Sequence, residues 1–225
     1  MQRISRRAAI GGAVVAVGAL GTLAGRWLGR SATSARAAAE PVARMPLFSD
    51  PQDPVLGNPH GTLPMAEFFD YRCPYCRRMH KLITQVLKDN PDIRYVAKEW
   101  PVFGGASVTA ARVALAANWQ GKFAAVNAAL FTTTGGLDAK SIDAAAQAAG
   151  ADMAQLRHDL ASRDAELQSM LGNVAMQAAS LGLQGTPGFL IGTYLVPGAL
   201  SYDDLTKVVA EARTKLQPAS VTKVR

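Results

Sequence analysis

The chain has 225 residues, and its 24 Lys and Arg against 17 Asp and Glu give a formal net charge of +7. Six arginines and no acid lie in residues 1–37, which leaves 18 basic against 17 acidic side chains elsewhere and argues against a nucleic-acid-binding surface. Hydrophobic residues make up 49% of the chain, which excludes a disordered polymer, and two cysteines are too few for a disulfide scaffold.

Residues 1–39 have the pattern of an export signal. Three arginines among the first seven residues precede an uncharged stretch, 8–25, and A-x-A sites follow within 35–39. Ser5-Arg6-Arg7 contains a twin-arginine pair, which predicts the Tat route. We therefore expect cleavage and a periplasmic or otherwise extracytoplasmic location. An uncleaved membrane anchor is the alternative, although five glycines make this stretch weakly hydrophobic.

The next segments predict a strand, a helix and a second strand. Residues 40–62 are rich in Pro, Gly, Asn and Asp and predict an N-terminal linker or loop, with a short strand near Val55-Leu56. A buried strand is expected over 63–70, a helix with one apolar face over 74–90, and a strand over 93–97. Two parallel strands joined by a helix form a βαβ unit.

The second half of the chain is predominantly helical in its pattern. Helices are predicted over 106–119, 122–131, 138–149, 152–161 and 164–181. Two short strands around Gly192 predict a hairpin, and Ser201 with Asp204 resembles a capping box that begins a final helix ending near residue 216. We expect an α/β domain over 63–217, with a mixed sheet, a helical insertion at about 106–181, and a tail over 218–225.

Both cysteines lie in Cys73-Pro74-Tyr75-Cys76, where the first strand gives way to the helix. Pro74 suits the first helical turn because its missing N–H has no partner there. Cys73 is then the N-cap, in front of free N–H groups and the positive end of the helix dipole, which stabilise a thiolate. Cys76, one turn further on, can attack a mixed disulfide on Cys73 and release the partner. The motif predicts thiol–disulfide exchange.

Other interpretations of the cysteine pair are weaker. A structural disulfide here would close a very small loop and stabilise little. Cys73, Cys76 and His80 could bind a metal, but a structural zinc site needs four ligands. Haem attachment is excluded because Arg77, not His, follows Cys76. We therefore expect no cofactor and no metal.

Polar residues surround the motif. His80 could tune the thiolate, but a half-buried histidine on the helix surface is the favoured interpretation. Arg72, Arg77, Arg78 and Lys81 could favour the thiolate or guide acidic partners, and a solvated helix face is the favoured interpretation.

The stretch from Glu67 to Cys76 resembles the active-site segment of DsbA-like thiol–disulfide oxidoreductases, a branch of the thioredoxin superfamily. Gly185-Thr186-Pro187-Gly188-Phe189 is similar to the second signature of that family, a loop with a cis-proline before a strand. The resemblance extends over about 55–216, including 98–104 after the second strand. It implies a thioredoxin-like fold whose helical insertion lies between the second and third core strands.

The resemblance implies roles for individual residues. Cys73 would be the exposed nucleophile and Cys76 the resolving thiol, and together they would form the redox disulfide. A cis Pro187 would face this disulfide, and the backbone of Thr186 would pair with an extended substrate. Glu67 matches a buried acid that exchanges protons with Cys76, and a salt-bridged strand residue is the alternative of equal weight.

The residues around the two signatures bear on the direction of exchange. Pro74-Tyr75 differs from the Pro-His of the strongest oxidases in the family, and Pro-Tyr and the Thr before the cis-proline also occur in isomerases and reductases. Those isomerases carry an N-terminal dimerisation domain, whereas fewer than about 25 mature residues precede the first core strand here. We expect a monomeric oxidase of exported proteins, regenerated by a redox partner that could be membrane-bound. An isomerase or reductase is the alternative.

Overall fold

The computed structural model describes residues 36–37 and 46–216. Apart from Arg36–Ala37, the expected export signal lies outside the described residues, as does the tail over 218–225. In the part that is described, no helix combines the length and apolar composition needed to cross a bilayer.

A mixed sheet forms the centre of the described domain, with the strand order β1-β6-β5-β3-β4-β2. The strands are β1 (Arg36–Ala37), β2 (Val55–Gly57), β3 (Leu63–Phe69), β4 (Ile93–Glu99), β5 (Gly188–Ile191) and β6 (Tyr194–Pro197). β3 and β4 are parallel, and the other neighbouring pairs are antiparallel, which confirms the predicted mixed sheet. The strand β1 was not expected, because two residues are too few to show an alternating pattern.

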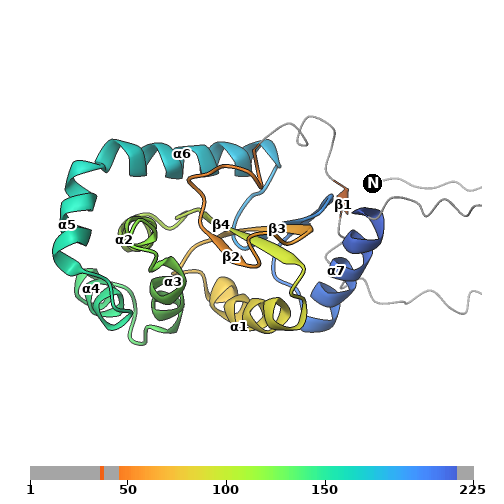
Figure 1. Ribbon diagram of the computed structural model, residues 1–225, viewed down its shortest axis with the longest axis horizontal. Helices are drawn as coiled ribbons and strands as arrows, with labels where there is room; N and C mark the ends of the chain where they lie inside the picture. Colours follow the sequence, from red (N-terminus) through yellow and green to blue (C-terminus); the bar gives the residue numbers. More distant parts are fainter. Residues whose placement is uncertain (1–35, 38–45, 217–225) are drawn as a thin grey trace, which may run out of the picture. The chain divides into compact units, whose positions relative to one another are not determined.

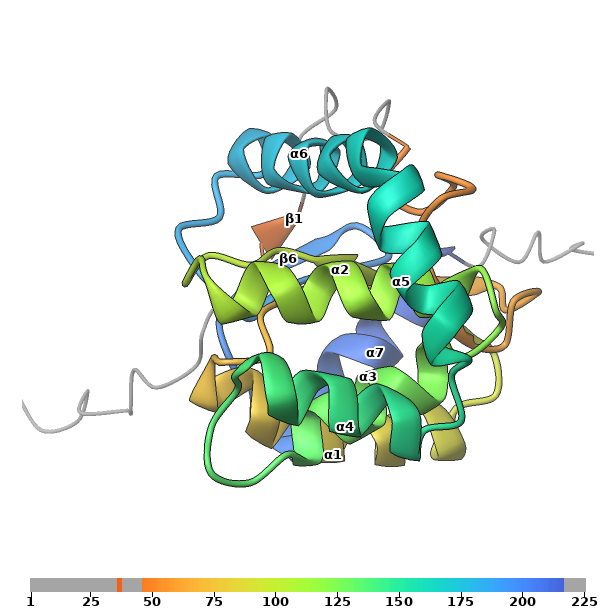
Figure 2. The ribbon, with the colours of Figure 1, turned by 90° about the vertical axis from the view of Figure 1, so that its left-hand side faces the viewer.

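Seven helices accompany the sheet within the described residues. They are α1 (Pro74–Asp89), α2 (Ala106–Asn118), α3 (Phe123–Thr132), α4 (Ala139–Ala148), α5 (Met153–Ser162), α6 (Asp164–Ser180) and α7 (Tyr202–Leu216). α1 connects the parallel strands β3 and β4, as such a pair requires. The block α2–α6 lies between β4 and β5 in the chain. Its centre is α2, which contacts α3, α4, α5 and α6 through a surface rich in buried alanine (Figure 2).

The two faces of the sheet are covered by different helices, with α6 on one side and α1 and α7 on the other (Figure 1). Ala66 and Phe68 of β3 pack in the core that includes residues of α6, whereas Met65 and Phe69 belong to the core that includes α1 and α7. Successive strand residues point to opposite faces. Glu67 therefore faces the α1 side, where Cys76 is buried.

The segment expected to be a linker packs against the domain. Leu47 is 2% exposed and lies in the α6-side core, and β2 pairs with β4. Asp53 forms an ion pair with the fully buried Lys98, and burial raises the pKa of Asp53 to about 6 despite this partner. The domain thus begins before Leu63. The strand expected near Val55-Leu56 is present as β2. The sequence did not show that the residues before it pack, because Leu47 and Asp53 contact partners far along the chain.

Candidate functional site

A buried carboxylate organises the turn that leads from β3 into α1. Asp70 Oδ1 accepts hydrogen bonds from the Arg72 backbone N–H (2.8 Å) and the Ser107 hydroxyl (2.7 Å). Its Oδ2 accepts one from the backbone N–H of Phe103 (3.0 Å), and its carbonyl accepts one from Cys73 N–H (3.0 Å). Asp70 therefore ties the cysteine turn to the loop before α2. The sequence did not reveal this role, because two of these partners lie more than thirty residues away.

Cys73 is the N-cap of α1 and Pro74 occupies the first turn, as predicted. The Cys73 side chain caps no backbone N–H with a hydrogen bond, so it leaves these donors available to a charged sulfur. Cys76 is fully buried one turn further on, and both cysteines are free thiols in this structure.

A distant loop covers Cys73. The Thr186–Pro187 peptide bond is cis, and Cys73 Sγ lies 3.3 Å from the carbonyl oxygen of Thr186. Cys73 is only 2% exposed, so the expectation of an exposed nucleophile is wrong. The reason is tertiary, since a segment 113 residues further along the chain closes over the sulfur.

The surroundings of Cys73 favour its thiolate. The pKa of Cys73 falls from 9.0 to about 5, chiefly because the Cys76 thiol donates a hydrogen bond to Cys73 Sγ. Burial opposes this fall in pKa, while the Thr186 side chain and the N–H groups of Cys76 and Tyr75, as donors available to a charged sulfur, add to it. Thr186 Oγ1 is buried without a hydrogen-bond partner among the described residues, so its hydroxyl is free to donate to a Cys73 thiolate. At neutral pH Cys73 is therefore a thiolate.

Cys76 shows the opposite behaviour. Burial raises its pKa far above the ordinary value, and its hydrogen bond to Cys73 and the charge of Glu67 act in the same direction. One helical turn therefore carries a thiol that is ionised at neutral pH and a thiol that keeps its proton. The predicted order, with Cys73 as nucleophile and Cys76 as resolving thiol, stays a prediction, and it requires an asymmetry of this sign.

Glu67 lies on the sheet face that α1 covers. The Tyr95 hydroxyl donates a hydrogen bond to Glu67 Oε2 (2.5 Å), whereas Oε1 is buried without a partner among the described residues. Burial raises the pKa of Glu67 to about 8, and the nearby charge of Cys73 contributes. The carboxyl group therefore keeps its proton at neutral pH. The salt-bridged alternative finds no support, because Glu67 has no cationic partner among the described ion pairs.

A second buried carboxyl group lies beside the same turn. The Tyr71 hydroxyl donates to Glu99 Oε1 (2.6 Å) and lies 2.9 Å from Asn127 Oδ1. Burial raises the pKa of Glu99 well above its ordinary value. These three residues join β4, the cysteine turn and α3, so they connect the site to the helical insertion.

Arg77 is not the solvated residue that the sequence favoured. It is half-buried, and its Nε donates to the Tyr71 carbonyl (3.1 Å). Its Nη1 donates to the carbonyls of Phe131 (2.8 Å) and Thr133 (2.9 Å), at the end of α3. The last carbonyls of a helix lack partners within the helix, and Arg77 supplies a partner from α1.

The remaining candidates around the motif are His80, Tyr75 and Arg78. His80 is half-buried, as expected, and its ring stacks on Phe131 with 4.7 Å between ring centroids. Burial lowers the pKa of His80. Tyr75 is 52% exposed, and the Arg78 guanidinium lies 4.5 Å from the centre of its ring. Within the described residues, no group of three His, Cys, Asp or Glu side chains could hold a metal ion.

The described domain resembles known proteins in sequence and in fold. The family described as thioredoxin matches residues 49–211. Three similar solved structures are a thioredoxin-like oxidoreductase from Silicibacter pomeroyi DSS-3, a periplasmic thioredoxin-like protein from Salmonella enterica serovar Typhimurium, and the thiol-disulfide exchange protein alpha-DsbA2 from Wolbachia pipientis.

Their sequence identities to this chain are 39%, 31% and 27%, with TM-scores of 0.72, 0.70 and 0.70. The alignments cover 76%, 80% and 74% of this chain and 98%, 99% and 90% of those chains.

Among curated proteins, the Na(+)/H(+) antiporter NhaA 1 of Mycolicibacterium gilvum is 30% identical over 146 residues, which are 63% of this chain and 24% of the antiporter. The chain thus spans about a quarter of the length of the curated relatives that it matches. From the family match and the shared fold, the chain belongs to the thioredoxin superfamily, as a DsbA-like member.

Proposed function

We propose that the chain is an exported thiol–disulfide oxidoreductase, and that it acts as an oxidase that transfers the Cys73–Cys76 disulfide to protein substrates. The opposite pKa shifts of the two cysteines carry this proposal, with the Cys73 pKa at about 5 and that of Cys76 strongly raised. A stabilised Cys73 thiolate stabilises the reduced form of the pair. A couple with a stabilised reduced form is a stronger oxidant, so its disulfide passes readily to a substrate.

The exchange proceeds in two displacements. A substrate thiolate attacks Cys73 Sγ, the Cys73–Cys76 bond breaks, and Cys76 leaves as a thiolate that takes up a proton. A second substrate thiolate then attacks the substrate sulfur of the mixed disulfide and expels Cys73 as a thiolate. The substrate has lost two electrons and gained a disulfide, and the protein holds the reduced pair.

Glu67 suits the proton transfer in the first displacement. Its charge is close enough to Cys76 to influence the pKa of that thiol, and its own pKa is raised to about 8. A protonated Glu67 can therefore give its proton to the leaving Cys76 thiolate inside the core, where water is scarce. Thr186 and Pro187 would hold an extended substrate beside Cys73, with Pro74 and Tyr75 completing the motif.

The cellular setting is part of the proposal. The leader over 1–39 would direct export by the twin-arginine route, and one of the similar structures is a periplasmic protein. The partners would be exported proteins with thiols and a redox protein that re-oxidises the pair. We propose a monomer, with a body of balanced charge that needs no nucleic-acid partner.

Trapping of the mixed disulfide tests this function. In a Cys76→Ala variant of the full chain, Cys73 should accumulate disulfide adducts with exported proteins, visible on non-reducing gels and lost on reduction. Cys73→Ala is the matched control and should form none. An absence of adducts together with tight metal uptake by the reduced wild type would favour the metal-binding alternative through Cys73, Cys76 and His80.

A pair of substrates separates oxidase from isomerase or reductase. The oxidised protein should introduce disulfides into a reduced, unfolded substrate faster than the reduced protein repairs a scrambled one. The reverse order would assign isomerase activity. The reduction potential of the Cys73–Cys76 pair, measured against glutathione buffers, sets the direction independently.

A further inference from the structure

A cationic cleft of about 470 Å³ lies beside α1, next to the cysteine site. One wall consists of Arg77, Arg78 and Lys81 of α1, and the other consists of Phe131 and the following threonines at the end of α3. No carboxylate lines it. The cleft and the nucleophile therefore share one helix.

Its charges are not neutralised from within the protein. In the described part of the chain, no carboxylate lies within ion-pair distance of Arg77, Arg78 or Lys81. Arg78 and Lys81 are exposed, while two guanidinium nitrogens of Arg77 donate hydrogen bonds to backbone carbonyls. The two positive charges of Arg78 and Lys81 thus face solvent in a hollow without a carboxylate partner.

The positions of the cations follow the helix away from the nucleophile. Cys73, Arg77 and Lys81 are spaced by four residues and so lie along one face of α1. At a rise of 1.5 Å per residue, Arg77 and Lys81 lie roughly 6 and 12 Å along the helix from Cys73. An extended chain advances about 3.3 Å per residue, so these distances correspond to two to four residues of a bound substrate.

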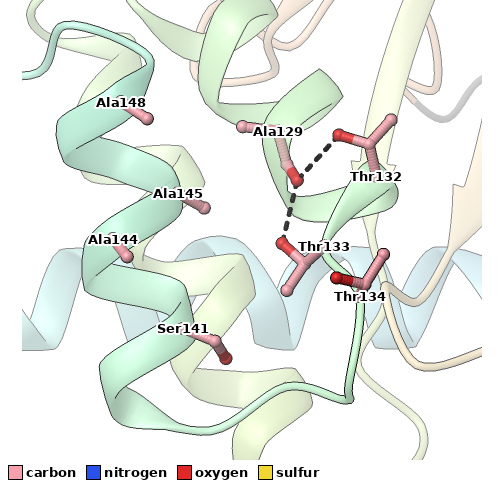
Figure 3. Close-up of a pocket in the computed structure, with 8 residues that line it drawn as sticks. All are labelled: Ala129, Thr132, Thr133, Thr134, Ser141, Ala144, Ala145 and Ala148. Carbon is pink, nitrogen blue, oxygen red and sulfur yellow. Dashed lines mark hydrogen bonds between the residues drawn. The ribbon is translucent and has the colours of Figure 1, made fainter.

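A neighbouring hollow provides the contrast. It has about 400 Å³ and lies between α3 and α4, where Ala144, Ala145 and Ala148 face Thr132 and Thr133 (Figure 3). The hydroxyls of both threonines donate to the Ala129 carbonyl, and no charged side chain lines this hollow. Two adjacent hollows of similar size therefore differ in charge, and the charged one adjoins α1.

We propose that the α1 cleft binds carboxylate side chains of the polypeptide substrate, two to four residues from the cysteine that exchanges with Cys73. The substrate class is thus a protein with acidic residues close to its reactive cysteine. This inference rests on the proposed function and adds a preference among its substrates. Arg78 and Lys81 would bind the carboxylates, while Arg77 holds the cleft walls together.

The test uses two peptides of equal composition with one cysteine each. In one, three aspartates lie two to four residues from the cysteine, and in the other they lie ten or more residues away. The oxidised full chain is mixed with each peptide thiol at low salt, and the rate of mixed-disulfide formation is followed by stopped-flow tryptophan fluorescence. The quantity compared is the rate ratio of the near-acid to the far-acid peptide.

The double variant Arg78→Gln with Lys81→Gln should lower this ratio about fivefold relative to wild type, as expected for the loss of two solvent-exposed ion pairs. Wild type and the double variant are tested with the same two peptides. Any effect of the aspartates on the reactivity of the peptide thiol is therefore the same for both proteins and cancels. In 1 M salt, where the screening length is about 3 Å, the difference between the two proteins should nearly disappear. Lys88→Gln removes a charge from the same helix outside the cleft and should keep the wild-type ratio.

Equal ratios for wild type and the double variant would overturn the inference, while the proposed function would stand as long as both peptides react. A Lys88→Gln protein that loses as much preference would also overturn it, since the effect would then be one of overall charge. If neither peptide reacts with the wild type, the proposed function fails and this inference fails with it.

Discussion

The start of α1 differs from the starts of α4 and α5, two helices of the insertion. Asp152 accepts hydrogen bonds from two backbone N–H groups at the start of α5, and Asp138 forms a capping box with Ser141 at α4. At α1 the N-cap is Cys73, whose side chain makes no such bond. α4 and α5 thus use their free N–H groups for stability. In α1 the same kind of donor stays free beside Cys73, where it favours the thiolate.

The largest effect should follow from giving α1 an ordinary cap. Cys73→Ser places a favoured capping residue at the N-cap and removes the nucleophile. Exchange with any thiol substrate should fall at least about a thousandfold, since a hydroxyl cannot replace a thiolate in this chemistry. The turnover rate of a disulfide substrate measures this loss of exchange activity. Residual activity above about one per cent of wild type would show that Cys76 acts as a nucleophile by itself.

The same variant should also change how stability depends on pH. The folded Cys73 pKa of about 5 lies below the ordinary 9.0, so its thiolate stabilises the reduced protein fully above pH 9. That contribution decreases as the pH falls from 9 towards 5. In urea unfolding, the stability of the reduced wild type should therefore decrease as the pH falls from 9 towards 5. Cys73→Ser should lack this decrease. Identical pH profiles would contradict the lowered pKa.

Glu67 should have the next largest effect. Its contribution to stability should depend on pH in the opposite direction from that of Cys73. Its folded pKa of about 8 exceeds the ordinary 4.5, so the unfolded chain releases this proton first and stability decreases from pH 5 to pH 8. Glu67→Gln should remove this loss. At 1.36 kcal/mol per pKa unit, the variant should gain roughly 3 kcal/mol on wild type over this range.

Urea titrations of the oxidised proteins at both pH values measure this difference. Burial, the main cause of the shift, is present in both redox forms. A constant difference between Glu67→Gln and wild type would show that Glu67 is ionised in the core. If the Cys76 thiolate formed with the mixed disulfide takes up its proton more slowly in Glu67→Gln than in wild type, this would support the proposed proton transfer from Glu67.

The caps of the insertion should matter for stability but not for exchange. Asp152→Ala removes the acceptor for the N–H groups of Ala154 and Gln155 and should cost about 1 kcal/mol of unfolding free energy. The exchange rate of the folded variant should equal that of wild type. An altered rate would show that α5 and the cysteine site are coupled, and the comparison between the helix starts would then be incomplete.

The smallest effect concerns the loop over Cys73. Thr186→Val keeps the shape of the side chain and removes the hydroxyl that lowers the Cys73 pKa. The pH midpoint of iodoacetamide alkylation of reduced Cys76→Ala protein should rise by less than about one unit, the scale of a single hydrogen bond. Thr133→Val removes a hydroxyl distant from the cysteines and should leave the midpoint unchanged. A fall in the midpoint on Thr186→Val would mean that Thr186 destabilises the thiolate.

Local sequence signals predicted most of the elements. The apolar face of α1, the asparagine and proline after it, and the capping residues before α4, α5 and α7 all act within one or two helical turns. For that reason each predicted helix lies within two residues of its observed bounds. The edge strand β1 and the packed segment around Leu47 gave no comparable signal, because their positions depend on partners far along the chain.

The sequence by itself determined the spacing of Cys73 and Cys76 and their place between a strand and a helix, because spacing and helix geometry act locally. Tertiary structure decided what surrounds the pair. It closes Thr186 over Cys73, sets Tyr95 against Glu67 and binds Arg77 to the end of α3. These contacts join residues from 28 to 113 positions apart, and burial of the carboxyl and thiol groups, which produces their pKa shifts, exists only once such contacts form.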